Sequence, residues 1–179
     1  SDVRLLIALW ELGVRGASLT WSRRNLLASG CCKASECYEI RGGLSPEGFD
    51  VVREMERLGM FVDVSHLNDD GFENIRETAI RTFMATHSNS REVAFHYRNL
   101  TDTQMQILAD QGGIAGLNGC VRLVLETEEE EYPDENGVYC LEKLCMHVEH
   151  MVEVMGPEHV GYGFDFCDSY TAAERMAEG

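Results

Sequence analysis

Three side chains in this sequence have the chemistry of metal ligands, and each follows a short apolar run. His66, His87 and Asp165 come two or three residues after such runs. Imidazole nitrogens and carboxylate oxygens are the usual protein ligands of zinc and similar divalent ions. An ion held in this way lowers the pKa of bound water and yields hydroxide at neutral pH. A single histidine would be explained as a hydrogen-bonded core or loop residue, but three such residues after three apolar runs favour a site.

The apolar runs have the length of buried strands, and segments with helical spacing separate them. Ser45 and Pro46 mark one helix start, because serine caps a helix and proline suits its first turn. Thr101 is a second predicted cap, and Asn68 or Asp69 a third. The predicted strands are residues 15–20, 60–64, 82–85, 114–117 and 159–162, and the predicted helices are residues 4–12, 46–58, 69–80, 102–111 and 140–155.

The alternation of strands and helices indicates an α/β fold with a parallel sheet covered by helices. Two architectures are open: a doubly wound open sheet, or a (β/α)₈ barrel. No GxGxxG or GxxxxGK[ST] motif follows a predicted strand, which weakens the nucleotide-binding version. Because the carboxyl ends of parallel strands meet on one face, His66 and His87 are expected to reach a single ion.

The other histidines, His96, His147, His150 and His159, fit this site less well. His147 and His150 lie three residues apart on a predicted outer helix, so we expect a solvated pair. His159 precedes its strand and is expected at the opposite face of the sheet. Arg98 is either a plain surface charge or a residue that holds a carboxylate by two hydrogen bonds; spacing alone leaves both open.

Charge and length exclude several classes of function. The 179 residues carry 15 Lys+Arg and 31 Asp+Glu, a formal net charge of −16. Such an acidic chain repels phosphate backbones and anionic lipid, so we expect neither nucleic-acid nor membrane partners. No apolar run approaches the roughly 20 residues that span a bilayer, and no signal sequence opens the chain. We therefore expect one domain, residues 1–179, in the cytoplasm.

Two further features have plain explanations that we favour. Seven cysteines lack CxxC spacing, so reduced thiols are preferred over a zinc knuckle built from Cys31, Cys32 and Cys37 or from Cys140 and Cys145. The acidic stretch 126–136 is interpreted as a solvated loop in preference to a cation site.

Several motifs together resemble the membrane (renal) dipeptidase family, the M19 metallopeptidases. Their order and spacing agree along most of the chain. The matching segments are Gly43 to Phe49, Val51 to Met60, Val62 to His66, Thr86 to Arg91, His96 to Asp102 and His159 to Phe166.

The resemblance implies a (β/α)₈-barrel zinc enzyme that hydrolyses dipeptides. In the family, two zinc ions share a bridging carboxylate and a hydroxide that attacks the peptide carbonyl. By resemblance, His66 and His87 match the histidines that bind one zinc. Arg98 matches the arginine that binds the substrate's terminal carboxylate, and Asp165 matches the acid that handles protons and the substrate's amino end.

The sequence also departs from the family pattern. The first zinc of the family is held by a His-x-Asp motif, and no histidine of this chain is followed two residues later by aspartate. The bridging glutamate also belongs to a region before the matched one, and Cys167-Asp168 stands where the family has Asp-Gly. We therefore expect a partial (β/α)₈ (TIM-type) barrel of about five parallel strands, lacking the N-terminal His-x-Asp region and the C-terminal end, with at most one partial zinc site.

Such a piece is expected to be weak or inactive as a dipeptidase and to associate with itself through its open barrel edges. The main alternative is a non-catalytic truncated barrel that binds a small molecule or self-assembles. Another metal-dependent barrel hydrolase, such as an amidohydrolase, ranks third because it lacks the match at Arg98.

Overall fold

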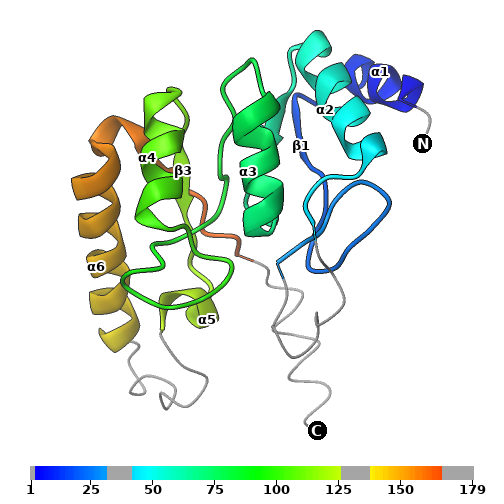
Figure 1. The fold of residues 1–179 in the computed structure, drawn as a ribbon. Coiled ribbons are helices and arrows are strands. Elements are labelled where there is room, and N and C mark those ends of the chain that lie inside the picture. Colours follow the sequence, from blue (N-terminus) through cyan, green and yellow to red (C-terminus); the bar gives the residue numbers. More distant parts are fainter. Residues whose placement is uncertain (1–2, 32–41, 126–137, 167–179) are drawn as a thin grey trace, which may run out of the picture.

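The computed structural model describes residues 3–31, 42–125 and 138–166, without the side chains of 138–140. Helices and short strands alternate, as the sequence predicts (Figure 1). The elements are α1 Arg4–Glu11, β1 Gly16–Ser18, α2 Pro46–Leu58, β2 Phe61–Asp63, α3 Asp69–Thr78, α4 Asp102–Asp110, β3 Ala115–Leu117, α5 Val121–Val124, α6 Val138–Met155, the 3₁₀ turn η1 Pro157–His159, and β4 Val160–Tyr162. Five helices therefore match the predicted ones, whereas the short helix α5 was not predicted.

The strands are parallel and follow one another in sequence order. β1 pairs with β2, and β3 pairs with β4, over three residues each. The predicted strand 82–85 is not a regular strand; it joins the two pairs through isolated parallel bridges, Asp63 with Met84 and Ala85 with Ala115. The strand order does not reverse along the sheet, whereas a doubly wound sheet requires such a reversal of strand order.

Close backbone contact explains how this middle segment fits between its neighbours. A Cβ atom on Gly116 or Gly163 would lie 2.0 or 1.8 Å from the carbonyl oxygen of Thr86. No side chain can be accommodated at that distance, so both positions require glycine. The segment that ends in His87 can therefore lie directly against β3 and the end of β4, because Gly116 and Gly163 have no side chains.

The helices begin and end at the residues that the sequence marks. The Ser45 hydroxyl accepts a hydrogen bond from the Gly48 amide at the start of α2, and Gly59 ends that helix in the left-handed region with φ of 74°. Asn68 caps α3, and Thr101 with Gln104 forms a reciprocal capping box on α4. These caps fix where each helix starts relative to the strand end before it.

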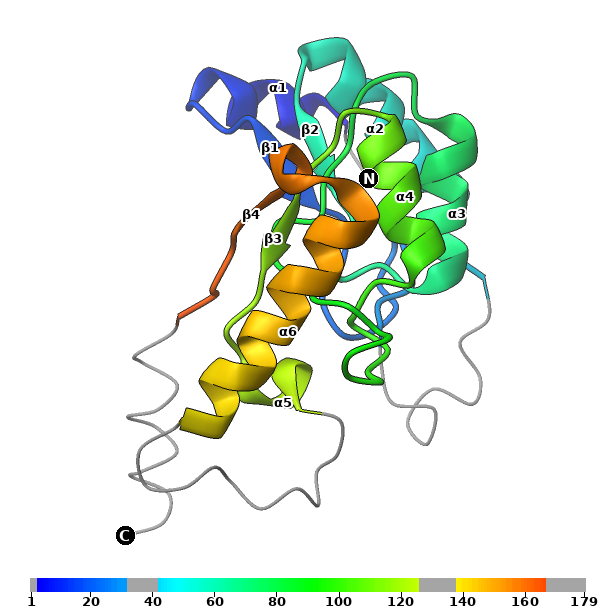
Figure 2. The same cartoon turned by 90° about the vertical axis from the view of Figure 1, so that its left-hand side faces the viewer.

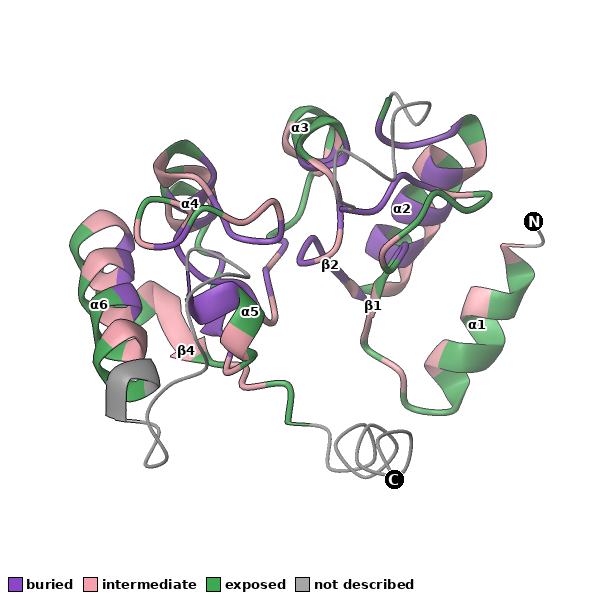
Figure 3. Ribbon diagram, turned by 90° about the horizontal axis from the view of Figure 1, so that it is seen from below, coloured by how far each residue is buried: buried purple, intermediate pink, exposed green. Residues whose placement is uncertain are grey.

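The core lies between the helices and the strands. Viewed from below, α1, α2, α3, α4 and α6 follow one another in an arc with the strands on its concave side, and the buried residues of α2 and α6 face inward (Figure 3). A side view shows α6 packed along β3 and β4 (Figure 2). Fully buried members include Met55, Ile75, Phe83, Leu108 and Met151. Within the described part of the chain, no helix is both long enough and apolar enough to cross a membrane.

Candidate metal and carboxylate site

His66 and His87 meet at the carboxyl ends of two adjacent parallel segments. Their Nε2 atoms lie 2.8 Å apart, and their ring centroids lie 4.8 Å apart. β2 leads into His66 within three residues, and the 82–86 segment leads directly into His87. The structure thus brings together the two histidines that the sequence predicts to share an ion.

Both imidazoles are neutral near pH 7. Burial, together with the charges of Arg98 and His87, lowers the pKa of His66 to about 3, although the charge of Asp63 opposes the shift. Burial also lowers the pKa of His87, again with help from the Arg98 guanidinium. A metal binds the unprotonated ring nitrogen, so this environment keeps the pair in the form that coordinates metal.

A buried carboxylate behind the histidines organises three strand ends. Asp63 accepts hydrogen bonds from the hydroxyls of Ser18, Ser65 and Thr86 at 2.6 to 2.7 Å, and from the amides of Ser65 and Thr86 at 3.0 Å. Burial by itself would raise the pKa of Asp63, but these hydrogen bonds lower it overall. The group is therefore an ionised acceptor, and every neighbour must donate to it. Sequence reasoning missed this role, although an aspartate inside an apolar strand was a visible signal.

This network sets the tautomer of His87. The Thr86 hydroxyl gives its only proton to Asp63, so Thr86 Oγ1 can only accept from His87 Nδ1, 2.7 Å away. His87 therefore carries its proton on Nδ1 and presents an Nε2 lone pair toward His66. A carboxylate that orients a ligand histidine through its second nitrogen is a common feature of metal sites.

Arg98 lies beside the histidines and is buried, with 8% of its surface exposed. Its guanidinium donates to the Ser88 hydroxyl at 3.3 Å and to the His87 carbonyl at 3.1 Å, and it approaches His66 Nε2 at 3.4 Å. The interpretation of Arg98 as a plain surface charge is therefore wrong. Within the described residues it has no ion pair, although buried charges are normally paired. The environment is thus suited to an anion supplied from outside.

Asp165 lies three residues after β4 and is exposed, with a positive φ of 58°. Its charge raises the pKa of both His87 and Arg98, which places it within electrostatic reach of the site. The structure gives its carboxylate no hydrogen bond to either residue. The four predicted site residues are therefore unequal: three are in contact, and the fourth influences them only through its charge.

The paired histidines fit a metal as two of its ligands. Two imidazoles on one tetrahedral zinc would have nitrogens about 3.3 Å apart, given Zn–N distances of about 2.05 Å. The observed separation differs from that by only a few tenths of an ångström, and the Nδ1 atom of His66 is buried without a partner. Among residues 3–31, 42–125 and 138–166, however, no three His, Cys, Asp or Glu side chains gather around one point. The described chain thus supplies half of a tetrahedral ligand set.

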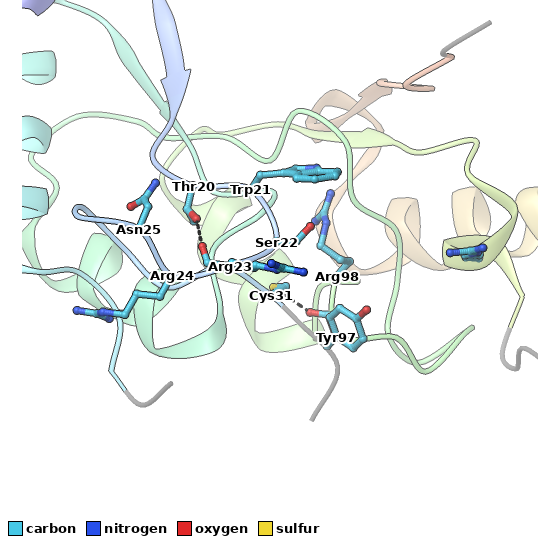
Figure 4. A pocket seen from close by; sticks show the side chains of 10 residues that line it. Thr20, Trp21, Ser22, Arg23, Arg24, Asn25, Cys31, Tyr97 and Arg98 are labelled. Carbon is cyan, nitrogen blue, oxygen red and sulfur yellow. Dashed lines mark hydrogen bonds between the residues drawn. The ribbon is translucent and has the colours of Figure 1, made fainter. Parts of the chain in front are cut away.

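A pocket of about 670 Å³ opens beside this site (Figure 4). The loop after β1 forms one wall and Tyr97 with Arg98 forms another. The ring of Trp21, which lines the pocket, lies 6.4 Å from the ring of His66, so this wall of the pocket lies near the histidine pair. Its lining residues are Thr20, Trp21, Ser22, Arg23, Arg24, Asn25, Cys31, Tyr97, Arg98 and Arg122.

The remaining histidines divide into two kinds. The expectation of a solvated His147 is wrong: this side chain is fully buried, accepts from the Ser90 amide at Nδ1 and lies 3.1 Å from the Val124 carbonyl at Nε2. His150 is half-buried and pairs with Asp102. His159 contacts the carbonyl of Gly113, which precedes β3, so it lies at the opposite end of the strands as expected.

The cysteines that the structure describes are unpaired. Cys31, Cys120 and Cys145 are free, and burial raises the pKa of Cys31 to about 11. The thiol of Cys31 contacts backbone carbonyls, which is a structural role. Cys32, Cys37, Cys167, the Cys140 side chain and the acidic stretch 126–136 lie outside the described residues.

The comparisons with known proteins agree with this geometry. The family model for membrane dipeptidases, peptidase family M19, matches residues 1–177. The chain belongs to peptidase family M19. Dipeptidase verJ of Clonostachys rogersoniana is 32% identical over 88% of the chain, and an uncharacterised protein of the pqqA 5′ region in Klebsiella pneumoniae is 30% identical over 98%.

Solved structures of M19 proteins share the fold of this chain. A metallopeptidase of Rhodobacter sphaeroides, liganded with a phosphinate mimic of the dipeptide L-Ala-D-Ala, matches with a TM-score of 0.82 and 27% identity over 99% of the chain. The chain spans 54% of that structure, 63% of the Klebsiella protein and 37% of dipeptidase verJ. It is thus a member of a metallo-dipeptidase family that covers part of the length of these relatives.

Proposed function

We propose that this M19 chain carries one zinc-binding histidine pair and the carboxylate-binding arginine of a zinc-dependent dipeptidase. The observation that carries the proposal is the contact between two neutral, converging imidazoles and a buried guanidinium without an ion pair in the described residues. A neutral pair suits a cation, and the buried guanidinium suits an anion. A dipeptide bound to a metal enzyme presents both a polarisable carbonyl and a terminal carboxylate.

Each residue would have a separate task. His66 and His87 would bind the metal through Nε2, and Asp63 with Thr86 would hold the His87 ring in place. Bound zinc would supply a water of lowered pKa and Lewis acidity toward the peptide carbonyl. Arg98 would hold the substrate's C-terminal carboxylate, which orients the scissile bond. Asp165, exposed at the edge of the site, would exchange protons with the leaving amine and contact the substrate's amino end.

The ligand count limits the activity expected of this chain by itself. Its sequence has no His-x-Asp motif, and its described residues supply two histidine ligands to one ion. We expect weak zinc binding and little or no hydrolysis of dipeptides by these 179 residues. Robust hydrolysis that a chelator and His66→Ala both abolish would show that the chain completes its site in another way.

The experiment that tests the proposal is a zinc titration against a chromophoric chelator, on the intact chain and on His66→Ala and His87→Ala. Zinc binding that depends on both histidines would support a partial metallo-dipeptidase site. Absence of zinc binding would favour the alternative, a non-catalytic module that binds small molecules or self-assembles. The control variant is Arg53→Ala, which changes an exposed residue of α2 and keeps every histidine. It should leave zinc binding unchanged.

We further propose that the five parallel segments are part of a (β/α)₈ barrel and that copies of the chain associate. Sequential parallel order and a single arc of helices support the barrel (Figure 3). Large apolar side chains stay exposed on α1 and around β4: Leu5 at 67%, Leu12 at 83%, Tyr162 at 86% and Phe166 at 81%. Light scattering that gives a monomer of 20.1 kDa at all concentrations would overturn the association.

A further inference from the structure

The loop that carries Arg98 is closed at its base by backbone pairing. Ser90 and Leu100 form an isolated parallel bridge, and the Leu100 carbonyl accepts from the Arg91 amide at 2.8 Å. The loop therefore leaves the chain three residues after His87 and returns to the same place. Because Arg98 lies two residues before the closing bridge, its position depends on the groups that hold this loop.

The side chain of Arg91 binds the backbone before and after Arg98. Its guanidinium donates to the Tyr97 carbonyl at 3.2 Å and to the Asn99 carbonyl at 2.8 Å. The Arg98 amide donates to Nδ1 of His96 at 3.1 Å. Side chains therefore bind both polar groups of the peptide unit that precedes Arg98 and the carbonyl of the residue that follows it, which fixes the point from which its guanidinium extends.

A carboxylate orients Arg91 in turn. The two oxygens of Asp69, at the start of α3, each accept from a terminal nitrogen of Arg91 at 3.0 Å, and Oδ1 also accepts from Gln104 at 3.0 Å. Burial by itself would raise the pKa of Asp69, but its hydrogen bonds with Arg91 and Gln104 and the charge of Arg91 lower it overall. A guanidinium can bind one carboxylate and two carbonyls at once because its donors form a planar fork, which an ammonium group lacks.

We infer that Arg91 is a positioning residue for Arg98: it holds the backbone on both sides of Arg98 and so keeps that guanidinium beside the histidine pair. Arg91 differs from an ordinary surface ion pair, because only 16% of its side chain is exposed and it shares its donors between Asp69 and the backbone of the loop. The inference rests on the proposed dipeptidase function for its consequence. A displaced Arg98 would bind the substrate's terminal carboxylate less tightly, whereas the histidine pair, which the Asp63 network holds, would keep its zinc affinity.

The test replaces Arg91 by lysine, which keeps the charge but loses the fork. Calorimetry on the zinc-supplemented full chain would compare Ala-Ala with its C-terminal amide. The parent chain should bind the free carboxylate about tenfold more tightly, and this ratio should fall toward one in Arg91→Lys, as in Arg98→Gln. Zinc affinity should stay unchanged in Arg91→Lys. The matched control is Arg76→Lys, which removes a two-point pair with Glu73 on α3 and should change neither quantity.

Hydrogen exchange of the backbone provides a second measurement that needs no ligand. In Arg91→Lys the amides of Arg98 and Asn99, which both donate to His96, should exchange faster. The His87 amide donates to the Ser65 hydroxyl outside this loop and should keep its exchange rate.

Asp69→Asn provides a second variant, because Asp69 is exposed and its replacement should not prevent folding. It weakens the same contact and should shift both measurements in the same direction, by less.

The outcomes separate this inference from the function on which it rests. Unchanged exchange and an unchanged affinity ratio in Arg91→Lys would overturn the inference and leave the dipeptidase proposal standing. Faster exchange with an unchanged ratio would assign Arg91 a structural role alone and would also overturn it. Equal binding of Ala-Ala and its amide by the parent chain, or binding of neither, would count against the proposed role of Arg98, and the exchange rates alone would then decide whether Arg91 positions it.

Discussion

Two regions of this molecule contain histidines that are at least half-buried, and the hydrogen bonds of these histidines differ. At the strand ends, His66 and His87 point their Nε2 atoms at each other, and Nδ1 of His66 has no partner. On α6, His147 is fully buried, whereas His66 and His87 are only half-buried, and it meets backbone groups at both nitrogens, the Ser90 amide and the Val124 carbonyl. The partners of each ring nitrogen therefore separate the candidate ligands from the structural residue.

The two regions differ in which groups form hydrogen bonds with the ring nitrogens. His147 is satisfied by groups that belong to the chain itself, so it stabilises the packing of α6 against α5 and the loop before α4. In the paired imidazoles, Nδ1 of His87 is held through Thr86, and the two Nε2 atoms face each other, where a metal would bind them. A histidine cluster that the protein does not satisfy by itself is the better candidate for function.

The largest expected effect is on stability and comes from His147, the histidine with a structural role. His147→Ala should lower the free energy of unfolding by about 3 kcal/mol, because it leaves a cavity and two unpaired backbone groups. His150→Ala removes a half-exposed pair with Asp102 and should cost less than about 1 kcal/mol. Urea denaturation measures both. Equal losses would mean that the buried contacts of His147 do not stabilise the fold.

The second effect concerns the candidate ligands. His66→Ala or His87→Ala should weaken zinc binding by about a hundredfold or more, which is about 2.7 kcal/mol, since each variant removes one of two ligands. His150→Ala provides the matched histidine deletion away from the site. Competition with a chelating dye gives the affinities. The distinction between the two regions breaks down if deletion of His150 weakens zinc binding as much.

A smaller effect is expected from the residue that orients His87. Thr86→Val keeps the shape of the side chain but removes the hydroxyl between Asp63 and His87 Nδ1, so zinc affinity should fall about tenfold. Thr86→Ser should restore it. Ser18→Ala is the control, because it removes a donor to the same carboxylate without touching the histidine. Nitrogen chemical shifts of the His87 ring should move in Thr86→Val alone; unchanged shifts would contradict the assigned tautomer.

The smallest effect is a pH dependence that His147 adds to stability. Burial lowers the pKa of His147, the charges of Lys143 and His150 lower it further, and the hydrogen bond to Val124 opposes them. A lowered folded-state pKa means that the unfolded chain binds the proton more readily. Stability is therefore full above about pH 6.5 and declines as the pH falls from there toward the folded pKa.

The measurement is the unfolding free energy between pH 7.5 and 5, in metal-free buffer, for the parent chain and for His147→Gln. The variant lacks this titration, so its curve should be flatter by the contribution of one group. All other histidines contribute equally to both curves and cancel in the difference. Parallel curves would show that His147 binds its proton equally well in both states.

Much of the fold follows from local signals in the sequence. Ser45, Asn68 and Thr101 cap helices where predicted, because capping depends on a side chain and an amide three residues later. The meeting of His66 and His87 also follows, since parallel strands place their carboxyl ends together. The 82–85 strand was predicted from an apolar run, but run length cannot show that this segment pairs with its neighbours only through the bridges at Met84 and Ala85.

What the sequence could not supply is long-range. Asp63 accepts hydrogen bonds from Ser18, which lies 45 positions earlier, and from Thr86, which lies 23 positions later. No local pattern in the sequence connects these three residues. His147 was predicted on a solvated face because a spacing of three residues shows only that two side chains share a side of a helix. Which side faces inward depends on α5, because the Val124 carbonyl of α5 contacts the His147 ring. This helix was not predicted.

The segment that carries His87 is also the joint between two strand pairs. β1 with β2 forms one ladder and β3 with β4 another, and single bridges at Met84 and Ala85 connect them. Because His66 follows one ladder and His87 follows the segment between the ladders, any group that binds both rings would link the two strand pairs at this joint. Its binding should therefore slow hydrogen exchange of the Ala85 amide more than that of amides within either ladder.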